Sequence, residues 1–380
     1  MDSEDQWPKK PTPILNERLP DLSELFSDIL KRDTENAAEF LLNIQWILYA
    51  KRPLEPVEFY SAVIVGTRDQ VQWEWNPSRI TAYDLDSFVY TSSKGLARVI
   101  RSIPPTVQFI DRSVRDFFLK DGGIQRLWPS LAADFQSQSH DRLKKCCYTY
   151  FRGHNYIASD QEPLDAPFHE TEALRQRALA KFPFLEYATQ QVLYHANIAA
   201  IGIPQHDFLR SLDFKTWIGL HNLFTKFEPL RRTPSVSLLY ILAENNFARL
   251  ISSIPWHDTG IYNNEKRCGH PIFAALARSH REAARALLES QLGLIVDSDS
   301  IATTLPCGER LRVSKAQMPL SWAAEHGYSK LAQLLVEKGP ENGGDLESRD
   351  SYGWTPLWIS MARRRYYGQQ EKGIMRQRSC

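Results

Sequence analysis

Apolar residues that recur every three or four positions predict helices along most of the chain. The first 20 residues lack this periodicity and hold four prolines, which is typical of a tail. Further along, the helical spacing gives way to two short β-prone runs with Pro104 and Pro105 between them. The elements expected are helices over 22–30, 40–48 and 57–65, a hairpin of 95–101 with 106–110, and a closing helix over 114–119.

The helical spacing of apolar residues returns in residues 121–225. A polar stretch at 160–167 interrupts it and predicts a surface loop. Pro183 is expected in the first turn of a helix. Proline is tolerated there because the N–H groups of the first turn have no hydrogen-bond partner within the helix. The helices expected in this part are 143–150, 170–180, 182–200, and one or two over 207–227.

The C-terminal part contains an internal repeat. Leu238, Pro271, Pro319 and Pro356 occupy equivalent positions, and the spacings between them are 33, 48 and 37 residues. Each copy predicts a pair of helices that cannot bury its own apolar face, so several pairs must stack. The pattern stops after Met361, and the last 30 residues carry six basic side chains and one acid. This predicts an incomplete last repeat followed by a solvated tail.

Composition narrows the possible functions. The 380 residues suggest two to three domains, and 46 basic against 45 acidic residues leave a net charge of +1. That balance argues against a general nucleic-acid binder, whose affinity comes from an excess of Lys and Arg. The helices expected at 57–65 and 78–90 carry Glu58, Asp84 and Asp86 instead of a basic cluster. Major-groove reading by either helix is therefore not expected.

Five cysteines, at 146, 147, 268, 307 and 380, are too few and too scattered for a disulfide framework. They indicate free thiols in a reducing compartment. One of the adjacent pair Cys146 and Cys147 is expected in the core and the other near the surface. No stretch has the apolar length of a membrane span or a secretory signal. The sequence thus predicts a cytoplasmic protein that does not contact a membrane.

No motif predicts catalysis or a metal site. His169 begins an expected helix, but Ala173 stands where a zinc protease helix needs its second His. Cys268, His270 and Cys307 match no common zinc spacing. A Gly-x-Ser-x-Gly nucleophile elbow is absent from the sequence. We therefore expect no enzyme, no catalytic residue, no metal and no cofactor; an unrecognised enzyme stays open as an alternative.

The repeats resemble the ankyrin family, most specifically in the third copy and in the turn of the fourth, DSYGWTPL. The upstream part resembles the region that follows the nucleotide-binding core in fungal NACHT–ankyrin proteins, which are NLR-like signalling ATPases. The matching stretches are IQWILYAKRPLEPVEFY (44–60), KGLARVI with TVQFIDRSVRDFFLKDGG (94–123), WPSLAADFQSQSHDRLKKCC (128–147) and FPFLEYATQQVLYHA (182–196). The resemblance covers most of residues 20–361 and implies a winged-helix-like module that serves intramolecular packing and switching.

Two departures limit what the resemblance implies. The sequence has no G-x-x-x-x-G-K-[ST], and its 18 glycines are scattered, so the family's nucleotide-binding loop is absent from these 380 residues. Relatives often carry a His in the F-I-H-x-S-V-x-D-F block, similar to the winged-helix His that senses bound nucleotide. Asp111 takes that place here, and its carboxylate would repel a diphosphate. Drift of the winged-helix-like module alone would also explain Asp111.

Together these patterns predict a mainly α fold with a winged-helix-like α+β module, a helical connector and a C-terminal ankyrin repeat solenoid. The domains expected are a flexible tail at 1–20, the winged-helix-like module at 21–120, the connector at 121–230, and about four ankyrin repeats at 231–380, the last incomplete.

The function expected is a non-catalytic protein-protein interaction scaffold or regulatory module of NLR-like type that lacks its nucleotide-binding core. A remnant of a split NACHT–ankyrin gene with no independent activity is the alternative. A protein partner would contact the concave face and turn tips of the repeats, without nucleotide or nucleic acid. The family's variable surface positions correspond to Ser351, Tyr352 and Trp354 in the fourth turn, and to Glu325 and His326 at the end of the third inner helix. Exposed Tyr and Trp commonly anchor interfaces, although Trp354 could equally pack on the neighbouring turn.

Overall fold

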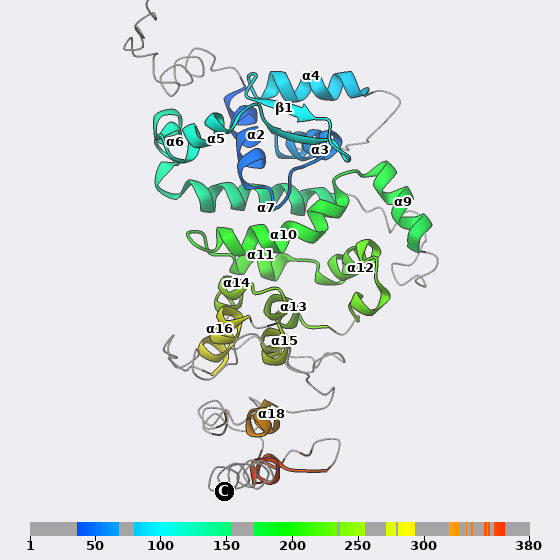
Figure 1. Ribbon diagram of the computed structural model, residues 1–380, viewed down its shortest axis with the longest axis vertical. Helices are drawn as coiled ribbons and strands as arrows, with labels where there is room; N and C mark the ends of the chain where they lie inside the picture. Colours follow the sequence, from blue (N-terminus) through cyan, green and yellow to red (C-terminus); the bar gives the residue numbers. More distant parts are fainter. Residues whose placement is uncertain are drawn as a thin grey trace, which may run out of the picture. The chain divides into compact units, whose positions relative to one another are not determined.

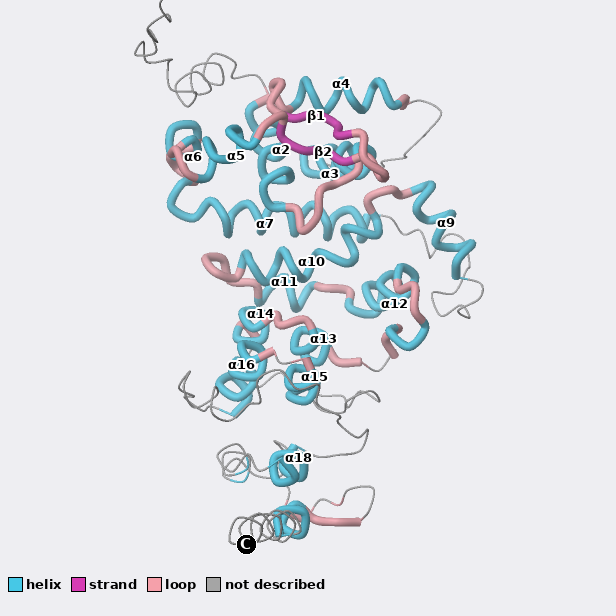
Figure 2. The backbone as a smooth tube through the Cα atoms, in the orientation of Figure 1, coloured by secondary structure: helices cyan, strands magenta, loops and turns pink. Residues whose placement is uncertain are grey.

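The computed structural model is mainly helical in the parts of the chain that it describes, as predicted (Figures 1 and 2). Two compact units divide the chain: the N unit, Met1–Val63 with Pro77–Phe135, and the C unit, Ile64–Asn76 with Gln136–Cys380. The domain boundaries expected at 20, 120 and 230 stay predictions. The described residues are 36–67, 80–153, 171–233, 236–254, 271–278, 280–292, 319–326 and 353–361, with single residues at 332, 336, 346, 347 and 349.

The N unit contains the helices and the hairpin that its sequence predicts, except that 22–30 lies outside the described residues. Its elements, in order, are α2 (Ala37–Tyr49), α3 (Pro56–Thr67, which ends just beyond the unit), α4 (Ala82–Ser92), β1 (Ala97–Ile100), β2 (Thr106–Phe109), α5 (Arg112–Leu119), α6 (Gly123–Leu127) and the short 3-10 turn η1 (Ala132–Asp134).

The two strands pair antiparallel, with Ala97 opposite Phe109 and Ile100 opposite Thr106. On the other edge of β2, the Val107 N–H donates to the Leu54 carbonyl over 2.8 Å. That bond ties the segment between α2 and α3 to the hairpin and satisfies a backbone amide on the free edge of β2.

Aromatic rings form the centre of the N unit. Trp128 stacks on both Phe118 and Phe135, with ring centroids 6.0 and 5.9 Å away. Gly123 permits the close approach of α6, because a Cβ there would lie 2.7 Å from the Phe117 carbonyl oxygen. The buried cluster comprises Phe40, Ile44, Leu48, Leu96, Val114, Phe117, Phe118, Ile124 and Phe135.

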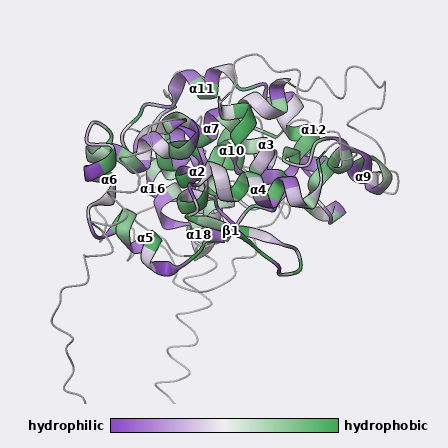
Figure 3. Ribbon diagram, turned by 90° about the horizontal axis from the view of Figure 1, so that it is seen from above, coloured by the Kyte–Doolittle hydropathy of each residue, from purple (hydrophilic) through white to green (hydrophobic). Residues whose placement is uncertain are grey.

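Helices alone make up the described part of the C unit. Its elements are α7 (Phe135–Gly153, whose first residue belongs to the N unit), α9 (Thr171–Lys181), α10 (Leu185–Ala199), α11 (His206–Ser211), α12 (Phe214–Phe224), η2 (Glu228–Leu230), α13 (Leu238–Glu244), α14 (Ala248–Ser252), α15 (Pro271–Ala277), α16 (Arg281–Leu292) and α18 (Pro319–His326). Figure 3 shows that α10 is largely hydrophobic while α9 carries more hydrophilic residues, in keeping with the deeper burial of α10.

One helix start differs from its prediction. Pro183 was expected in the first turn of a helix, but α10 begins only at Leu185. The Phe182 N–H donates to the Ala178 carbonyl, which ends α9, and the Leu185 N–H donates to the Phe182 carbonyl. Pro183 therefore lies in the tight turn between two helices, a position that its fixed φ angle also suits.

Four of these helices form two stacked pairs. α13 packs on α15, and α14 packs on α16, so the pair 238–252 lies against the pair 271–292. Asparagine side chains join successive layers: Asn197 Oδ1 accepts from the Leu250 N–H over 3.4 Å, and Asn246 Oδ1 accepts from the Ala283 N–H over 3.1 Å. Each bond satisfies an amide in the first turn of the next layer's second helix. Within the described parts of the chain, no helix combines the length and apolar character needed to cross a membrane.

Candidate partner-binding surfaces

The fourth repeat turn is described from Gly353 onward. Gly353 adopts a left-handed conformation (φ 77°), which favours glycine because it has no Cβ. Arg349 Nη1 donates to the Gly353 carbonyl over 3.0 Å, which closes the turn. Pro356 is buried at the start of a short helix at 356–361, and the Ile359 N–H donates to the Thr355 carbonyl. The turn therefore leads directly into a helix, as the repeat pattern predicts.

Trp354 packs on Trp358 of that helix, with ring centroids 5.3 Å apart and a 35° tilt between the rings. One packing partner of Trp354 thus lies in the helix that follows its own turn, and the Trp354 side chain stays 45% exposed. Leu357 and Met361 are more than half exposed beside it. We call Trp354, Leu357, Trp358 and Met361 the tryptophan patch.

The other residues predicted for this surface are described less fully. Ser351 and Tyr352 lie outside the described residues. Glu325 and His326 form the end of α18, where the sequence predicts the end of an inner helix, but their side chains are outside the described part. Of the predicted set, only the side chain of Trp354 is placed.

A comparison of equivalent positions shows what is particular about the patch. The second residue of each inner helix is Leu239, Ile272 and Leu320 in the first three copies, and each is at most 5% exposed. The fourth copy has Leu357 at this position, and it is 60% exposed. A position that is buried in three layers is thus open in the fourth.

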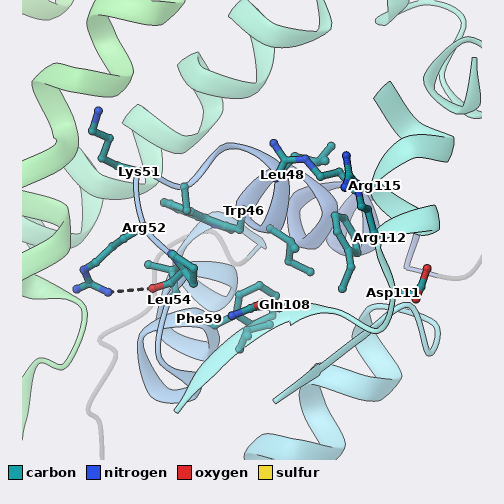
Figure 4. Close-up of a pocket in the computed structure, with 15 residues that line it drawn as sticks. Trp46, Leu48, Lys51, Arg52, Leu54, Phe59, Gln108, Asp111, Arg112 and Arg115 are labelled. Atoms are coloured by element: carbon teal, nitrogen blue, oxygen red, sulfur yellow. Dashed lines mark hydrogen bonds between the residues drawn. The ribbon is translucent and has the colours of Figure 1, made fainter. Parts of the chain in front are cut away.

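A second surface feature is a cavity of about 430 Å³ in the N unit (Figure 4). The C-terminal end of α2, the loop after it, Phe59 of α3, β2 and the start of α5 line this space, which is open on one side. Its apolar lining includes Trp46, Leu54 and Phe59, all almost fully buried. The charged residues of the lining are Lys51, Arg52, Asp111, Arg112 and Arg115.

The cations of this cavity differ in how they are held. Arg52 forms a two-pronged ion pair with Glu58, with N–O distances of 2.6 and 2.7 Å, and Glu58 also accepts from the Glu55 N–H. Arg112 lies 3.9 Å from Asp116, a loose contact, and its side chain is 84% exposed. Arg115 is exposed as well. Arg52 is therefore fixed in place, whereas Arg112 and Arg115 keep their charge largely uncompensated.

Asp111 has a local structural role. Its Oδ1 accepts from the Ser113 N–H over 2.8 Å, which makes it the N-cap of α5. That backbone hydrogen bond lowers the pKa of the Asp111 carboxyl below its usual value. Helix capping therefore accounts for an acidic residue at position 111. This role does not involve a nucleotide.

The sequence contains a signal for this cavity that is not among the motifs described above. Arg112 and Arg115 are three residues apart, so they share one side of α5, while Val114, Phe117 and Phe118 lie on its buried side. Lys51 and Arg52 follow directly after α2. The pair Lys51 and Arg52 and the pair Arg112 and Arg115 border one cavity because α2 packs against β2. No local sequence pattern specifies that packing.

Buried titratable groups gather in the C unit. His140 Nδ1 and His195 Nδ1 lie 2.9 Å apart, and His195 Nε2 lies 3.1 Å from the Tyr187 hydroxyl. Burial lowers the pKa of His140 to about 4 and that of His195 well below its usual range. Both rings are therefore neutral at neutral pH, with one Nδ1 donating and the other accepting.

A buried ionic cluster lies next to this pair in sequence. Lys144 Nζ donates to Asp141 Oδ1 over 2.6 Å and to Gln205 Oε1 over 2.7 Å. Gln205 Nε2 donates to the same Asp141 oxygen over 3.2 Å, and Lys145 pairs with Asp141 from outside. The donors and acceptors satisfy one another, which indicates a cross-link between α7 and the start of α11.

The prediction that one of Cys146 and Cys147 lies near the surface is wrong, because both are buried and free. Adjacent residues on a helix point about 100° apart, so α7 is enclosed over more than one face. Burial raises the pKa of the Cys146 thiol to about 12 and that of Cys147 well above its usual value. Neither cysteine is in its reactive thiolate form at neutral pH.

The described residues hold no group of three or more His, Cys, Asp or Glu side chains placed to bind a metal ion. His169, Cys268, His270 and Cys307, which were weighed as zinc ligands, lie outside the described residues.

Comparison with known proteins adds no family: no family model, no curated protein and no solved structure matches this chain.

Proposed function

We propose that this protein is a non-catalytic, cytoplasmic protein-interaction scaffold of NLR-like type. In this proposal it combines a winged-helix-like module, a helical connector and ankyrin repeats, without a nucleotide-binding core of its own. A partner protein binds the turn tips and concave face of the repeats.

The order of elements in the N unit supports the winged-helix assignment. Helix α2 is followed by a chain segment that bonds to β2 through Leu54, then by α3 and α4, and then by the β1–β2 hairpin. A winged helix has this sequence of helices and strands, with the hairpin as its wing. The helix that would read DNA has no basic cluster: α4 carries Asp84 and Asp86, and no lysine or arginine. The module therefore suits packing rather than DNA binding.

The stacked helix pairs of the C unit support the repeat assignment. α13 on α15 and α14 on α16 give the layered contacts of a solenoid, in which each repeat packs on its neighbours. The amides of Leu250 and Ala283, each the third residue of a second helix, both donate to an asparagine cap. Asn197 Oδ1 of α10 accepts from the first, and Asn246 Oδ1 of the turn after α13 accepts from the second. The two donor amides thus occupy corresponding positions in the two helix pairs, as a repeated sequence unit would produce.

The observation that carries the proposal is the tryptophan patch. Two half-exposed Trp rings in contact, with Leu357 and Met361 beside them, form an apolar surface on a turn of the kind that repeat proteins use for binding. Tryptophan is among the residues that contribute most to interface affinity, because its ring buries a large area at low entropic cost.

The test replaces both rings, Trp354→Ala with Trp358→Ala, and compares the proteins that co-purify with the full chain by quantitative mass spectrometry. The matched control is Tyr83→Ala with Tyr90→Ala, which removes two well-exposed rings from α4 of the N unit. We expect at least a tenfold loss of specific partners for the first double variant only. An unchanged partner set, with unchanged circular dichroism, would contradict the proposed site.

A second measurement tests the absence of nucleotide binding. Calorimetric titration of the full chain with ATP or GTP and Mg²⁺ should give no heat of binding at micromolar concentrations. A micromolar dissociation constant for either nucleotide would overturn the scaffold proposal.

A further inference from the structure

We propose that the tryptophan patch binds a second copy of this chain, with the two copies related by a two-fold axis. In the resulting dimer, the helix at 356–361 of one copy lies antiparallel on the same helix of the other copy. This inference rests on the proposed function, because it names the partner of the same patch.

Inner-helix positions that are closed in the earlier repeats are open at the patch. Tyr240 and Ser321, which are equivalent to Trp358, are each 1% exposed, whereas Trp358 is 57% exposed. Ala243 is fully buried, and its equivalent Met361 is 55% exposed. Helix α13, which carries Tyr240 and Ala243, packs on α15, the inner helix of the next pair. The patch therefore continues the kind of surface by which inner helices pack on one another, and a second copy supplies an inner helix to cover it.

The area of the patch is enough for a weak two-fold dimer. Its four side chains are between 45% and 60% exposed, which leaves on the order of 500 Å² of apolar surface, because the two Trp side chains are large. Contiguous apolar surfaces of this size mark protein–protein contacts. A two-fold interface uses the patch twice, so it buries about 1,000 Å² in total, the lower limit for specific association. We therefore expect a dimer that forms at micromolar concentrations.

The sequence around the patch carries opposite charges before and after the helix. The stretch before it holds three acids, Asp345, Glu347 and Asp350, and one base, Arg349, which gives a net charge of −2. The residues at 363–365, which follow the helix, are all arginine. A surface with an acidic end and a basic end is complementary to itself when a second copy lies in the opposite direction.

These charges therefore favour the antiparallel arrangement. In that arrangement the acidic stretch of each copy meets the arginine run of the other copy, so opposite charges come together at both ends. A parallel arrangement would bring like charges together at both ends, and their repulsion would oppose binding. In the antiparallel dimer the arginine run would also approach the half-exposed Trp354 ring of the other copy, a contact that guanidinium groups favour.

Sedimentation velocity of the full chain from about 1 to 100 µM measures the association, because this range spans the dissociation constant expected. Trp354→Ala with Trp358→Ala should weaken dimerisation at least tenfold, since it removes both large rings of the patch. The matched control is Tyr83→Ala with Tyr90→Ala, which removes two well-exposed rings from α4. We expect this control to change the dissociation constant less than twofold.

A charge exchange tests the antiparallel arrangement without altering the apolar patch. One variant makes the arginine run acidic, and a second makes the acidic stretch basic. Each variant alone should dimerise at least tenfold more weakly, because both of its ends then carry the same sign of charge. An equimolar mixture of the two should associate as strongly as the unaltered chain, since each end then meets its opposite in the other variant. The first variant carries Arg363→Glu, Arg364→Glu and Arg365→Glu, and the second carries Asp345→Lys, Glu347→Lys and Asp350→Lys.

Three results would overturn the inference. They are an unaltered chain that stays monomeric up to about 100 µM, an equal effect of the Trp and Tyr double variants, or a mixture of the charge variants that does not associate. The co-purification test follows other proteins, so the two failures are distinguishable. A monomeric chain whose partners depend on Trp354 and Trp358 would overturn this inference alone, and a Trp-dependent dimer with an unchanged partner set would overturn the proposed function alone.

Discussion

The two units of this protein are stabilised in different ways. The buried cluster of the N unit consists of aliphatic and aromatic side chains, and Trp128 stacks on both Phe118 and Phe135 of this cluster. The C unit also buries apolar residues, but it adds charged and titratable groups, among them His140, Asp141, Lys144, Arg175, His195 and Glu244. Glu58 is the corresponding buried charged residue in the described part of the N unit.

This difference follows from architecture. The N unit surrounds a single centre, so aromatic rings from several elements meet and exclude water. The C unit is a succession of helices whose contacts are mostly with neighbours, and polar cross-links set how each helix meets the next. Lys144 bonds to Gln205, 61 residues away, and Glu244 pairs with both Arg232 and Arg278. Such polar cross-links fix how the helices of the C unit pack on one another. They also make the stability of this unit sensitive to the loss of either charged partner.

The largest effect that this comparison predicts is the loss of a central ring in the N unit. Phe118→Ala removes a buried side chain that contacts Phe117, Phe109 and Trp128, with ring centroids 5.1, 6.0 and 6.0 Å away. We expect a loss of about 4 kcal/mol in the free energy of unfolding of the N unit. Hydrogen exchange as a function of urea, read by mass spectrometry, assigns this loss to residues 36–63 and 80–135.

The neighbouring substitution Leu119→Ala is the control, since Leu119 is 44% exposed on the same helix. It should cost well under about 1 kcal/mol. Equal losses for the two variants would show that the ring cluster does not dominate the stability of this unit.

The sequence predicted the helices and the hairpin of the N unit better than it predicted the candidate sites, and the reason is physical. Helices α2, α3 and α5 and the hairpin follow from the spacing of apolar residues, which reports which side of each element faces a core. The contact between His140 and His195 joins residues 55 positions apart, and the cavity joins the end of α2 to the start of α5. Such contacts depend on how elements pack, and residue spacing carries no record of that.

The second prediction removes a charge from the C unit. In Glu244→Gln the shape is kept, but the side chain of Arg232, only 9% exposed, loses its anion and Arg278 remains nearby. An uncompensated buried charge is costly, so we expect the free energy of unfolding of the C unit to fall by about 3 kcal/mol. Urea unfolding by circular dichroism, together with hydrogen exchange in α13 and α15, measures the effect.

An exposed ion pair of the same unit supplies the control. Glu289→Gln breaks the i,i+4 pair with Arg285 on α16, where both side chains are more than a third exposed. It should change stability by about 0.5 kcal/mol or less. If Glu244→Gln were equally mild, the polar cross-links would be incidental to the stability of the C unit.

The third prediction separates the two units by pH. All ten histidines of the sequence lie at position 140 or beyond, so the N unit has none. Burial lowers the pKa of His140 to about 4 and that of His221 to about 4, so both rings stay neutral in the folded protein. The unfolded chain takes up their protons near pH 6.5, which means that stability is complete above that pH and is lost as pH falls toward 4.

From pH 7.5 to pH 5, His140 alone accounts for a loss of about 2 kcal/mol in the C unit. The N unit should keep its stability over this range, because the carboxyls of Asp84 and Asp111, whose pKa values are lowered by backbone hydrogen bonds, remain ionised. Hydrogen exchange at the two pH values, corrected for intrinsic rates, follows both units in one sample. The variant His140→Asn keeps a donor for His195 without a titrating ring, so the pH-dependent loss should shrink by about the same 2 kcal/mol. Equal acid sensitivity of both units, or an unchanged loss in His140→Asn, would show that the buried histidines do not set the difference between them.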